Sequence, residues 1–157
     1  MPQSTQPSPT DYAARIAKLQ AAMKEFGLQA LVLEPGGAMM YLTGVRWGRS
    51  ERTFALVLPQ KGEPAFILPG FEEMRARELT PPGADIRIWQ EDESPFQRIV
   101  QVLKDRGVTS GRVGMDESMR FFVFDGIRKL APKLDYVSVQ PVLKSAGVDT
   151  TPPRRRR

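Results

Sequence analysis

The sequence predicts an α/β domain, built as a layered mixed β-sheet flanked by helices. Segments with helical apolar periodicity alternate along the chain with short apolar runs of strand length. Two of these runs are joined by the turn-forming segment 59–64, which indicates one antiparallel hairpin in an otherwise mostly parallel sheet. With 157 residues, of which 41% are apolar, the chain is large enough for one domain with a buried core.

The expected helices are recognised by their ends and by their apolar spacing. Ser8 and Pro9 form a cap-then-proline start, and apolar residues recur at steps of three and four until Gly27 ends the helix. Ser94 and Pro95 repeat this start before a second amphipathic helix. In order, the chain predicts a helix over 9–26, a strand over 30–33, hairpin strands over 53–58 and 65–68, a short helix over 70–79, a strand over 86–89, a helix over 95–106, a strand over 112–115, a helix over 119–130 and a strand over 136–139.

Three loop segments contain residue types that are found in known kinds of site. Asp116-Glu117 could hold a metal or act as an acid–base pair. Two acids before the helix 119–130 are more typical of a helix cap, because carboxylates suit the positive end of the helix dipole. Gly36-Gly37 and the loop 44–50 lack the Gly-Lys-Ser/Thr of a phosphate loop, and we expect no helix to follow either of them.

The composition excludes several classes of site. The sequence contains no cysteine and no histidine, so it has no disulfide, no serine–histidine triad and no histidine-containing zinc site. The net charge is +5, but Arg154–Arg157 supply four of these charges, so the rest of the chain is nearly neutral. No run approaches the roughly 20 apolar residues of a membrane span, and residues 1–9 lack the apolar core of a secretory signal. We expect a cytoplasmic protein with disordered ends at 1–9 and 146–157.

The candidate site is the loop after Thr43, which carries two glycines, a tryptophan and three arginines within residues 44–52. Tryptophan and arginine are enriched at recognition surfaces, and a guanidinium binds a carboxylate through paired hydrogen bonds. We predict that this region faces a substrate or partner through Tyr41, Arg46, Trp47 and Arg49. The alternative is a turn whose tryptophan folds back onto the sheet and whose arginines are solvated.

Several stretches, in their order and spacing, resemble the N-terminal domain of the creatinase/prolidase family (peptidase M24), which includes the Xaa-Pro aminopeptidases and dipeptidases. The resemblance covers about residues 11–145. Its parts are the opening helix and strand over 15–33, the signature Tyr41-Leu42-Thr43-Gly44, the hairpin over 53–69, the glycine-rich strand Gly111–Asp116 that ends in an acid, and the linker-like Leu143-Lys144-Ser145. The resemblance implies a creatinase N-terminal-like domain over 10–145 with a ribonuclease-H-like topology.

The resemblance also implies what the chain does not do. In the family this domain precedes a catalytic domain whose two divalent metal ions are held by two aspartates, a histidine and two glutamates. Because that domain is missing here, the resemblance implies no catalytic residue, no metal ligand and no cofactor in this chain, and no enzymatic activity. It implies a supporting role, with oligomer contacts (a homodimer or a peptidase catalytic domain as partner) and a share in the entrance for a proline-containing peptide.

The end of the sequence departs from the family pattern. Lys144-Ser145 should lead into an acidic helix, but Ala146-Gly147-Val148-Asp149 and a tail of threonines, prolines and arginines follow instead. We therefore expect a truncated or frameshifted family member, or a fragment cut at the domain boundary, with a dedicated short protein as the less favoured alternative.

Two other functions stay open. One is a basic-tailed module that binds nucleic acid or another anionic partner through Arg154–Arg157, which would make a salt-sensitive site. The other is an enzyme that uses carboxylates alone, such as Glu34 with Asp116 or Glu117 brought together at strand ends. We rank the supporting domain first, the basic-tailed module second and the carboxylate enzyme third. No membrane partner is expected.

Overall fold

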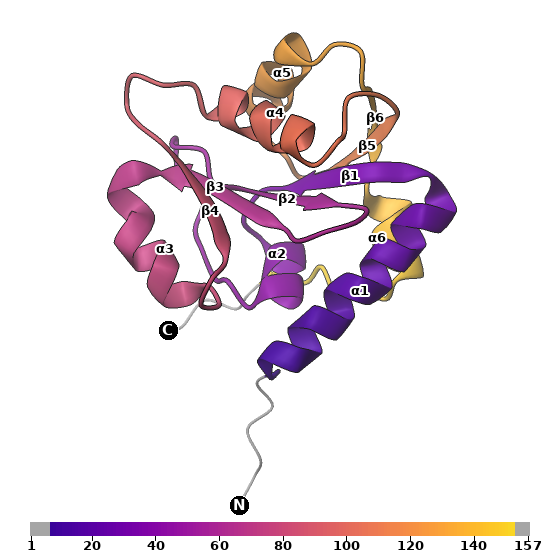
Figure 1. Cartoon of the computed structure of the whole chain (residues 1–157). Helices are drawn as coiled ribbons and strands as arrows, with labels where there is room; N and C mark the ends of the chain where they lie inside the picture. Colours follow the sequence, from indigo (N-terminus) through magenta and orange to yellow (C-terminus); the bar gives the residue numbers. More distant parts are fainter. Residues whose placement is uncertain (1–6, 153–157) are drawn as a thin grey trace, which may run out of the picture.

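The computed structural model describes residues 7–152, which form a six-stranded mixed β-sheet between two layers of helices (Figure 1). The strand order is β4-β3-β2-β1-β5-β6, in which β2 is antiparallel to both neighbours and the other neighbouring pairs are parallel. This arrangement confirms the predicted fold class and its single hairpin. The strands are β1 (Leu28–Leu33), β2 (Ala55–Pro59), β3 (Ala65–Pro69), β4 (Asp85–Trp89), β5 (Arg112–Met115) and β6 (Asp135–Ser138).

The helices cover both faces of the sheet. Those of the described chain are α1 (Pro9–Phe26), α2 (Gly37–Thr43), the 3-10 turn η1 (Gly70–Glu72), α3 (Glu73–Leu79), α4 (Pro95–Asp105), α5 (Phe121–Leu130) and α6 (Gln140–Ser145). One face packs against α1, α2, α3 and α6, and the other packs against α4 and α5 (Figure 1). None of these helices is long and apolar enough to cross a membrane.

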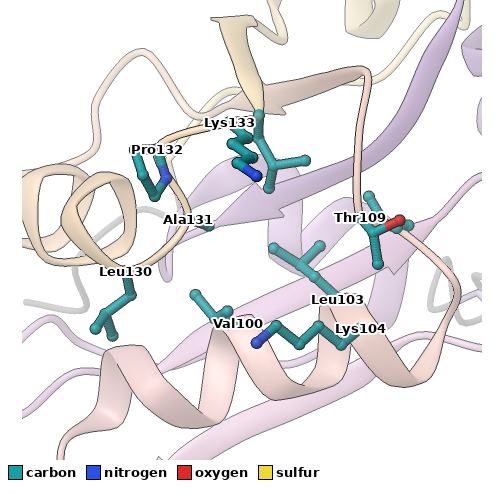
Figure 2. Close-up of a pocket in the computed structure, with 10 residues that line it drawn as sticks. Val100, Leu103, Lys104, Thr109, Leu130, Ala131, Pro132 and Lys133 are labelled. Atoms are coloured by element: carbon teal, nitrogen blue, oxygen red, sulfur yellow. The ribbon is translucent and has the colours of Figure 1, made fainter.

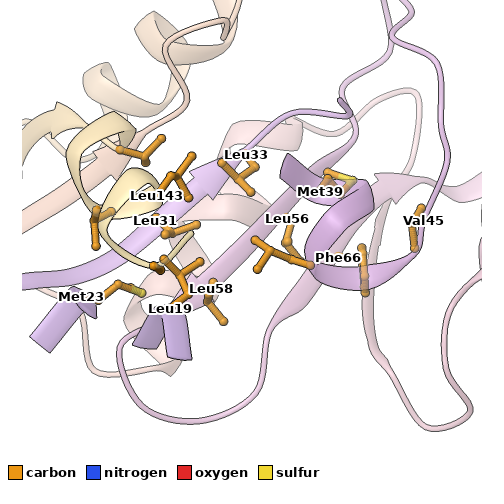
Figure 3. Close-up of a cluster of buried hydrophobic side chains, with 14 of the residues drawn as sticks. Leu19, Met23, Leu31, Leu33, Met39, Val45, Leu56, Leu58, Phe66 and Leu143 are labelled. Carbon is orange, nitrogen blue, oxygen red and sulfur yellow. The ribbon is translucent and has the colours of Figure 1, made fainter. Parts of the chain in front are cut away.

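The two faces of the sheet carry side chains of different size. Figure 3 shows the larger cluster, in which leucines of β1 and β2 meet Met23 of α1, Met39 of α2 and Leu143 of α6. These three side chains are at most 2% exposed. Burying a side chain of this size stabilises the fold by about 2 kcal/mol. On the opposite face, the alternating positions of β1 are Ala30 and Val32, which leave room for α4 and α5.

The first helix begins and ends as its sequence predicts. The hydroxyl of Ser8 accepts a hydrogen bond from the backbone N–H of Asp11 at 3.2 Å, and the Asp11 carboxylate accepts one from the backbone N–H of Ser8 at 2.8 Å. This reciprocal pair is a capping box, with Pro9 in the first turn. Gly27 follows the helix with φ of 72°, a left-handed conformation that favours glycine.

Two local predictions are wrong. A helix, α2, does begin at Gly37, and the apolar run that follows belongs to it because Met39 and Leu42 reach the core from one helix face. In addition, Asp116-Glu117 do not cap α5, whose N-cap residue Arg120 has no side-chain cap bond. Asp116 instead accepts hydrogen bonds from the backbone N–H and the hydroxyl of Ser118, at 2.9 and 2.7 Å.

The chain also stays packed beyond the predicted end of the domain. Helix α6, which the sequence analysis did not predict, leads to Ala146, and this residue is only 6% exposed in the core. Further on, the backbone of Thr150 passes so close to Gly37 that a Cβ on the glycine would lie 2.2 Å from the Thr150 carbonyl oxygen. Residues 146–152 of the predicted disordered tail therefore lie against the domain. Residues 1–6 and 153–157 of the predicted ends lie outside the described residues.

An ion cluster ties the start of β4 to the end of α4. Asp85 accepts hydrogen bonds from Arg87 Nε at 2.9 Å and from Arg106 Nη2 at 2.6 Å. Arg87 also donates to Asp105 at 2.8 Å. Burial raises the pKa of Asp85, but the hydrogen bonds from Arg87 and Arg106 outweigh this effect and hold the pKa below its ordinary value.

Candidate functional site

The candidate loop starts at a tight turn after α2. Gly44 has φ of 77°, and a Cβ at this position would lie 2.8 Å from the ring of Tyr12. Both the left-handed backbone and the close ring therefore favour glycine here. The backbone N–H of Val45 donates to the Thr43 hydroxyl at 3.2 Å, and this bond holds the first residues of the loop against the helix end.

Arg49 fixes the middle of the loop to the carboxyl edge of the sheet. Its Nε donates to the carbonyl oxygen of Pro35 at 2.8 Å, and its two Nη atoms donate to the carbonyl oxygen and hydroxyl of Ser118 at 2.6 and 2.7 Å. The guanidinium also lies 3.5 Å from Asp116 and 3.9 Å from Glu34. All three guanidinium nitrogens of Arg49 therefore donate hydrogen bonds within its own chain, although its side chain is 26% exposed.

Glu34 is the buried centre of the same network. It directly follows β1, its side chain is 0% exposed, and it accepts bonds from the backbone N–H of Arg120 at 2.7 Å and from Nε and Nη2 of that residue at 3.0 and 2.7 Å. Arg120 also donates to the carbonyl oxygen of Ser50 at 2.6 Å. Because β1 and β5 are parallel neighbours, Glu34 and Asp116 leave the sheet at the same edge, where the Glu34 N–H donates to Asp116 at 3.3 Å.

This network does not suit a divalent metal. The described residues contain no group of three acidic, histidine or cysteine side chains placed to hold one. Glu34 and Asp116 do come together, as the carboxylate-enzyme hypothesis requires, but Arg120 and Arg49 already pair with them. The Glu117 carboxylate bonds the hydroxyl of Ser138 instead of joining them. A metal would have to displace two guanidinium groups, which repel it.

Tyr41 and Arg46 lie in a different place from Arg49. They line a cavity of about 310 Å³ together with Arg15 and Tyr12 of α1 and Asp149 near the chain end. The guanidinium of Arg15 lies 3.9 Å from the ring centre of Tyr41, and its Nη1 donates to the Tyr41 carbonyl oxygen at 2.7 Å. Arg46 is exposed, and no ion pair within 4.0 Å engages it among residues 7–152.

Trp47 points in a third direction. Its ring centre lies 4.6 Å from that of Phe54, and the guanidinium of Arg75 lies 4.6 Å from the Trp47 ring. The side chain packs against the edge of the main core and is half-buried. Of the four predicted residues, the structure therefore brings together Tyr41 and Arg46, while Arg49 and Trp47 face different neighbours. Whether any of them contacts a substrate stays a prediction.

Sequence reasoning missed two residues of this region. Arg15 and Arg120 reach Tyr41 and Glu34 across 26 and 86 residues of sequence. The residues that flank an arginine in the sequence do not indicate which distant group its side chain will bind. The basic tail Arg154–Arg157, on which the nucleic-acid alternative depends, lies outside the described residues.

Comparison with known proteins gives a consistent result. Residues 15–146 match the model of the creatinase/prolidase N-terminal domain. The sequence is 32% identical over 134 residues to the probable dipeptidase PepE of Mycobacterium tuberculosis, a match that covers 84% of this chain and 33% of the relative. The fold superposes on a prolidase from Thermococcus sibiricus with a TM-score of 0.77 and 27% identity, covering 88% of this chain and 37% of that one.

These matches cover only the N-terminal part of the longer relatives. The chain spans about a third of the length of the curated relative and of the Thermococcus prolidase. By contrast, it covers 98% of a solved creatinase/prolidase N-terminal domain of an X-Pro dipeptidase from Streptococcus pyogenes, with a TM-score of 0.72. That domain is 17% identical, so it supports the fold alone.

Proposed function

Because the chain belongs to the creatinase/prolidase N-terminal domain family, we propose that it acts as a non-catalytic supporting domain for Xaa-Pro peptidase chemistry. In this role it contributes oligomer contacts and part of the entrance for a proline-containing peptide. On this proposal, the catalytic metal ions are held by residues outside the matched domain 15–146. A cytoplasmic location is part of this proposal and is tested by fractionating the cells that express the protein.

The observation that carries the entrance role is the state of Arg46. Arg49 is hydrogen-bonded within its own chain, and Arg52 pairs with Glu91 at 2.7 Å. Arg46 is exposed at the cavity beside Tyr41 and has no ion pair among the described residues. An exposed guanidinium at this cavity suits the carboxylate of a short peptide, and the Tyr41 ring, which stacks on Arg15, lines the same cavity for the apolar part of the peptide.

The oligomer role draws support from an exposed apolar pair on the other side of the loop. Met74 is 81% exposed and Phe71 is 64% exposed, and their spacing of three places them on one side of the η1–α3 segment. The guanidinium of Arg52 lies 5.1 Å from the ring centre of Phe71, and Arg75, the residue after Met74, lies over the ring of Trp47. Large apolar side chains gathered on a surface mark contact sites, and the occupant that we propose is a second copy of this chain.

Peptide binding and catalysis are tested separately. A ¹⁵N-labelled sample of the full chain is titrated with an Xaa-Pro dipeptide, and amide shifts are followed around Tyr41 and Arg46. We expect Arg46→Gln to weaken binding several-fold and Arg52→Gln, the matched control in the same loop, to leave it unchanged. Equal affinities for both variants would contradict the entrance role.

Catalysis is tested on the same sample in the presence of Mn²⁺. It should release no proline from the dipeptide, and metal-dependent release would show that the chain is an enzyme.

The oligomer contact is tested by sedimentation velocity at several protein concentrations. We expect the native chain to self-associate and Met74→Glu to shift it to monomer. Phe121→Glu, which alters a 69% exposed residue on α5, is the matched control and should sediment like the native chain. A native chain that is monomeric at all concentrations, or a Met74→Glu variant that associates normally, would exclude this contact.

A further inference from the structure

A separate pocket opens between the C-terminal ends of α4 and α5, on the sheet face opposite to α1 and α2. Figure 2 shows Val100, Leu103 and Lys104 of α4 on one side and Leu130 with the 131–133 segment on the other. Its volume is about 360 Å³, at the lower end of the range for small-molecule sites. None of the residues assigned to the candidate loop lines it.

The floor of this pocket is apolar and firmly held. Leu103, Val108 and Leu134 are 1%, 6% and 8% exposed, and all three belong to the core cluster under α4 and α5. Leu130 contrasts with them because it is 43% exposed and forms an open wall opposite Val100 (Figure 2). An apolar chain lying against Leu130 would bury surface that water now covers.

The rim of the pocket carries positive charge only. Lys104 and Lys133 extend along its two sides, from α4 and from the segment after α5 (Figure 2). No aspartate or glutamate lines the pocket, and within residues 7–152 neither lysine has a carboxylate partner within 4.0 Å. Lys129, near the end of α5, does have such a partner, because it pairs at 3.0 Å with Asp125 one helical turn earlier. Thr109 adds a hydroxyl donor at the same rim.

We propose that this pocket binds a small carboxylate with an unbranched apolar chain of medium length. The chain lies on the leucine and valine floor, and the carboxylate is held between the ammonium groups of Lys104 and Lys133. The match is one of charge and polarity, because the pocket offers an apolar floor, two cations and no anion. This inference is independent of the proposed supporting role.

The test is a ¹⁵N-detected titration of the full chain with hexanoate, octanoate and decanoate. We expect amide shifts confined to residues of α4, the end of α5 and the 131–134 segment. Affinity should rise about fourfold for each buried methylene, until the chain fills the pocket. Octanol, which has the same chain without the charge, should bind at least about fivefold more weakly than octanoate.

Matched variants separate the pocket from general attraction to a basic protein. Lys104→Glu/Lys133→Glu should weaken octanoate binding at least about tenfold. Lys61→Glu, which lies in the hairpin turn, is the control for charge reversal and should change nothing. Leu130→Ser should weaken binding several-fold, whereas Phe121→Ser on the same helix should not. All of these positions are exposed, so the spectra should show native folding.

The outcomes are distinct. Confined shifts that are lost in the lysine and Leu130 variants and kept in both controls would establish the site. Three results would overturn it: no saturable shift with any carboxylate, equal binding of octanol and octanoate, or equal weakening by Lys61→Glu, which marks non-specific binding to the basic surface.

Discussion

Replacing Glu34 by glutamine tests whether the buried carboxylate network holds the candidate loop in place. The substitution keeps the size of the side chain but removes its charge and one of its two acceptor oxygens. Glu34 is 0% exposed at its side chain and accepts three hydrogen bonds from Arg120. In the variant, the NH₂ group of the glutamine must face at least one of these N–H donors, and it cannot accept a hydrogen bond from it. The two guanidinium groups nearby also lose their buried counter-charge.

The structure sets the size of the expected loss. Removing one partner of a fully buried ion pair costs about 3–5 kcal/mol. Here the side chains of Arg120 and Arg49 are 30% and 26% exposed, so water can solvate part of the unpaired charge. We therefore expect Glu34→Gln to lower the free energy of unfolding by about 2–3 kcal/mol. With a slope of about 2 kcal/mol/M, the urea midpoint falls by about 1–1.5 M.

The assay is equilibrium unfolding in urea, followed by the fluorescence of Trp47 and Trp89. Glu51→Gln is the control, because the side chain of Glu51 is 85% exposed in its pair with Arg52 and should contribute less than about 0.5 kcal/mol. Amide exchange should also accelerate in the loop and around Ser118 in the Glu34 variant. If Glu34→Gln is no less stable than Glu51→Gln, the carboxylate does not anchor the loop and the argument fails.

Three further predictions concern other parts of the fold. Gly37→Ala should lower stability by about 1–3 kcal/mol in thermal unfolding, because the added Cβ meets the backbone of Thr150, whereas Gly48→Ala meets nothing within 4 Å and should stay within about 0.5 kcal/mol. Ser8→Ala removes the capping box of α1 and should lower the free energy of unfolding by about 1 kcal/mol. This is also measured by thermal unfolding, and an unchanged melting temperature would show that the cap does not contribute. The pKa of Asp85 is lower in the folded than in the unfolded chain, so its contribution is present above the unfolded value near 3.8 and is lost as the pH falls through the lower folded value. The stability gap between the native chain and Asp85→Asn should therefore be constant near neutral pH and shrink below about pH 4, and a gap that does not depend on pH would refute this.

Local signals predicted most of the fold. The serine–proline start and the glycine stop of α1 lie within a few residues of the helix they define, and the hairpin is visible from two apolar runs and their turn. Helix α2 was missed because it opens at Gly37 and has only seven residues. So short a helix is stabilised by burial of Met39 and Leu42 in the core rather than by its own propensity.

The candidate site was less accessible to such reasoning. Three arginines within residues 46–52 predict a recognition surface, yet the structure divides them by their partners. Arg49 bonds Pro35 and Ser118, whereas Arg46 has no ion pair among residues 7–152. The division depends on Glu34 and Ser118, which lie 15 and 69 residues from Arg49 in sequence. Periodicity and capping rules describe neighbours along the chain, so they contain no information about these contacts.

The position of the Glu34 network has a consequence for the order of folding. Strands β1 to β4 are neighbours both along the chain and in the sheet, whereas β1 pairs with β5 across the whole of the intervening strands β2 to β4. The contact between Glu34 and Arg120 joins residues that lie 86 positions apart. Loop closure of that length is entropically costly and comes late. We therefore expect the network to form after the transition state, so that weakening it speeds unfolding and leaves the folding rate nearly unchanged. On this view the seam between β1 and β5 is where the native domain first opens.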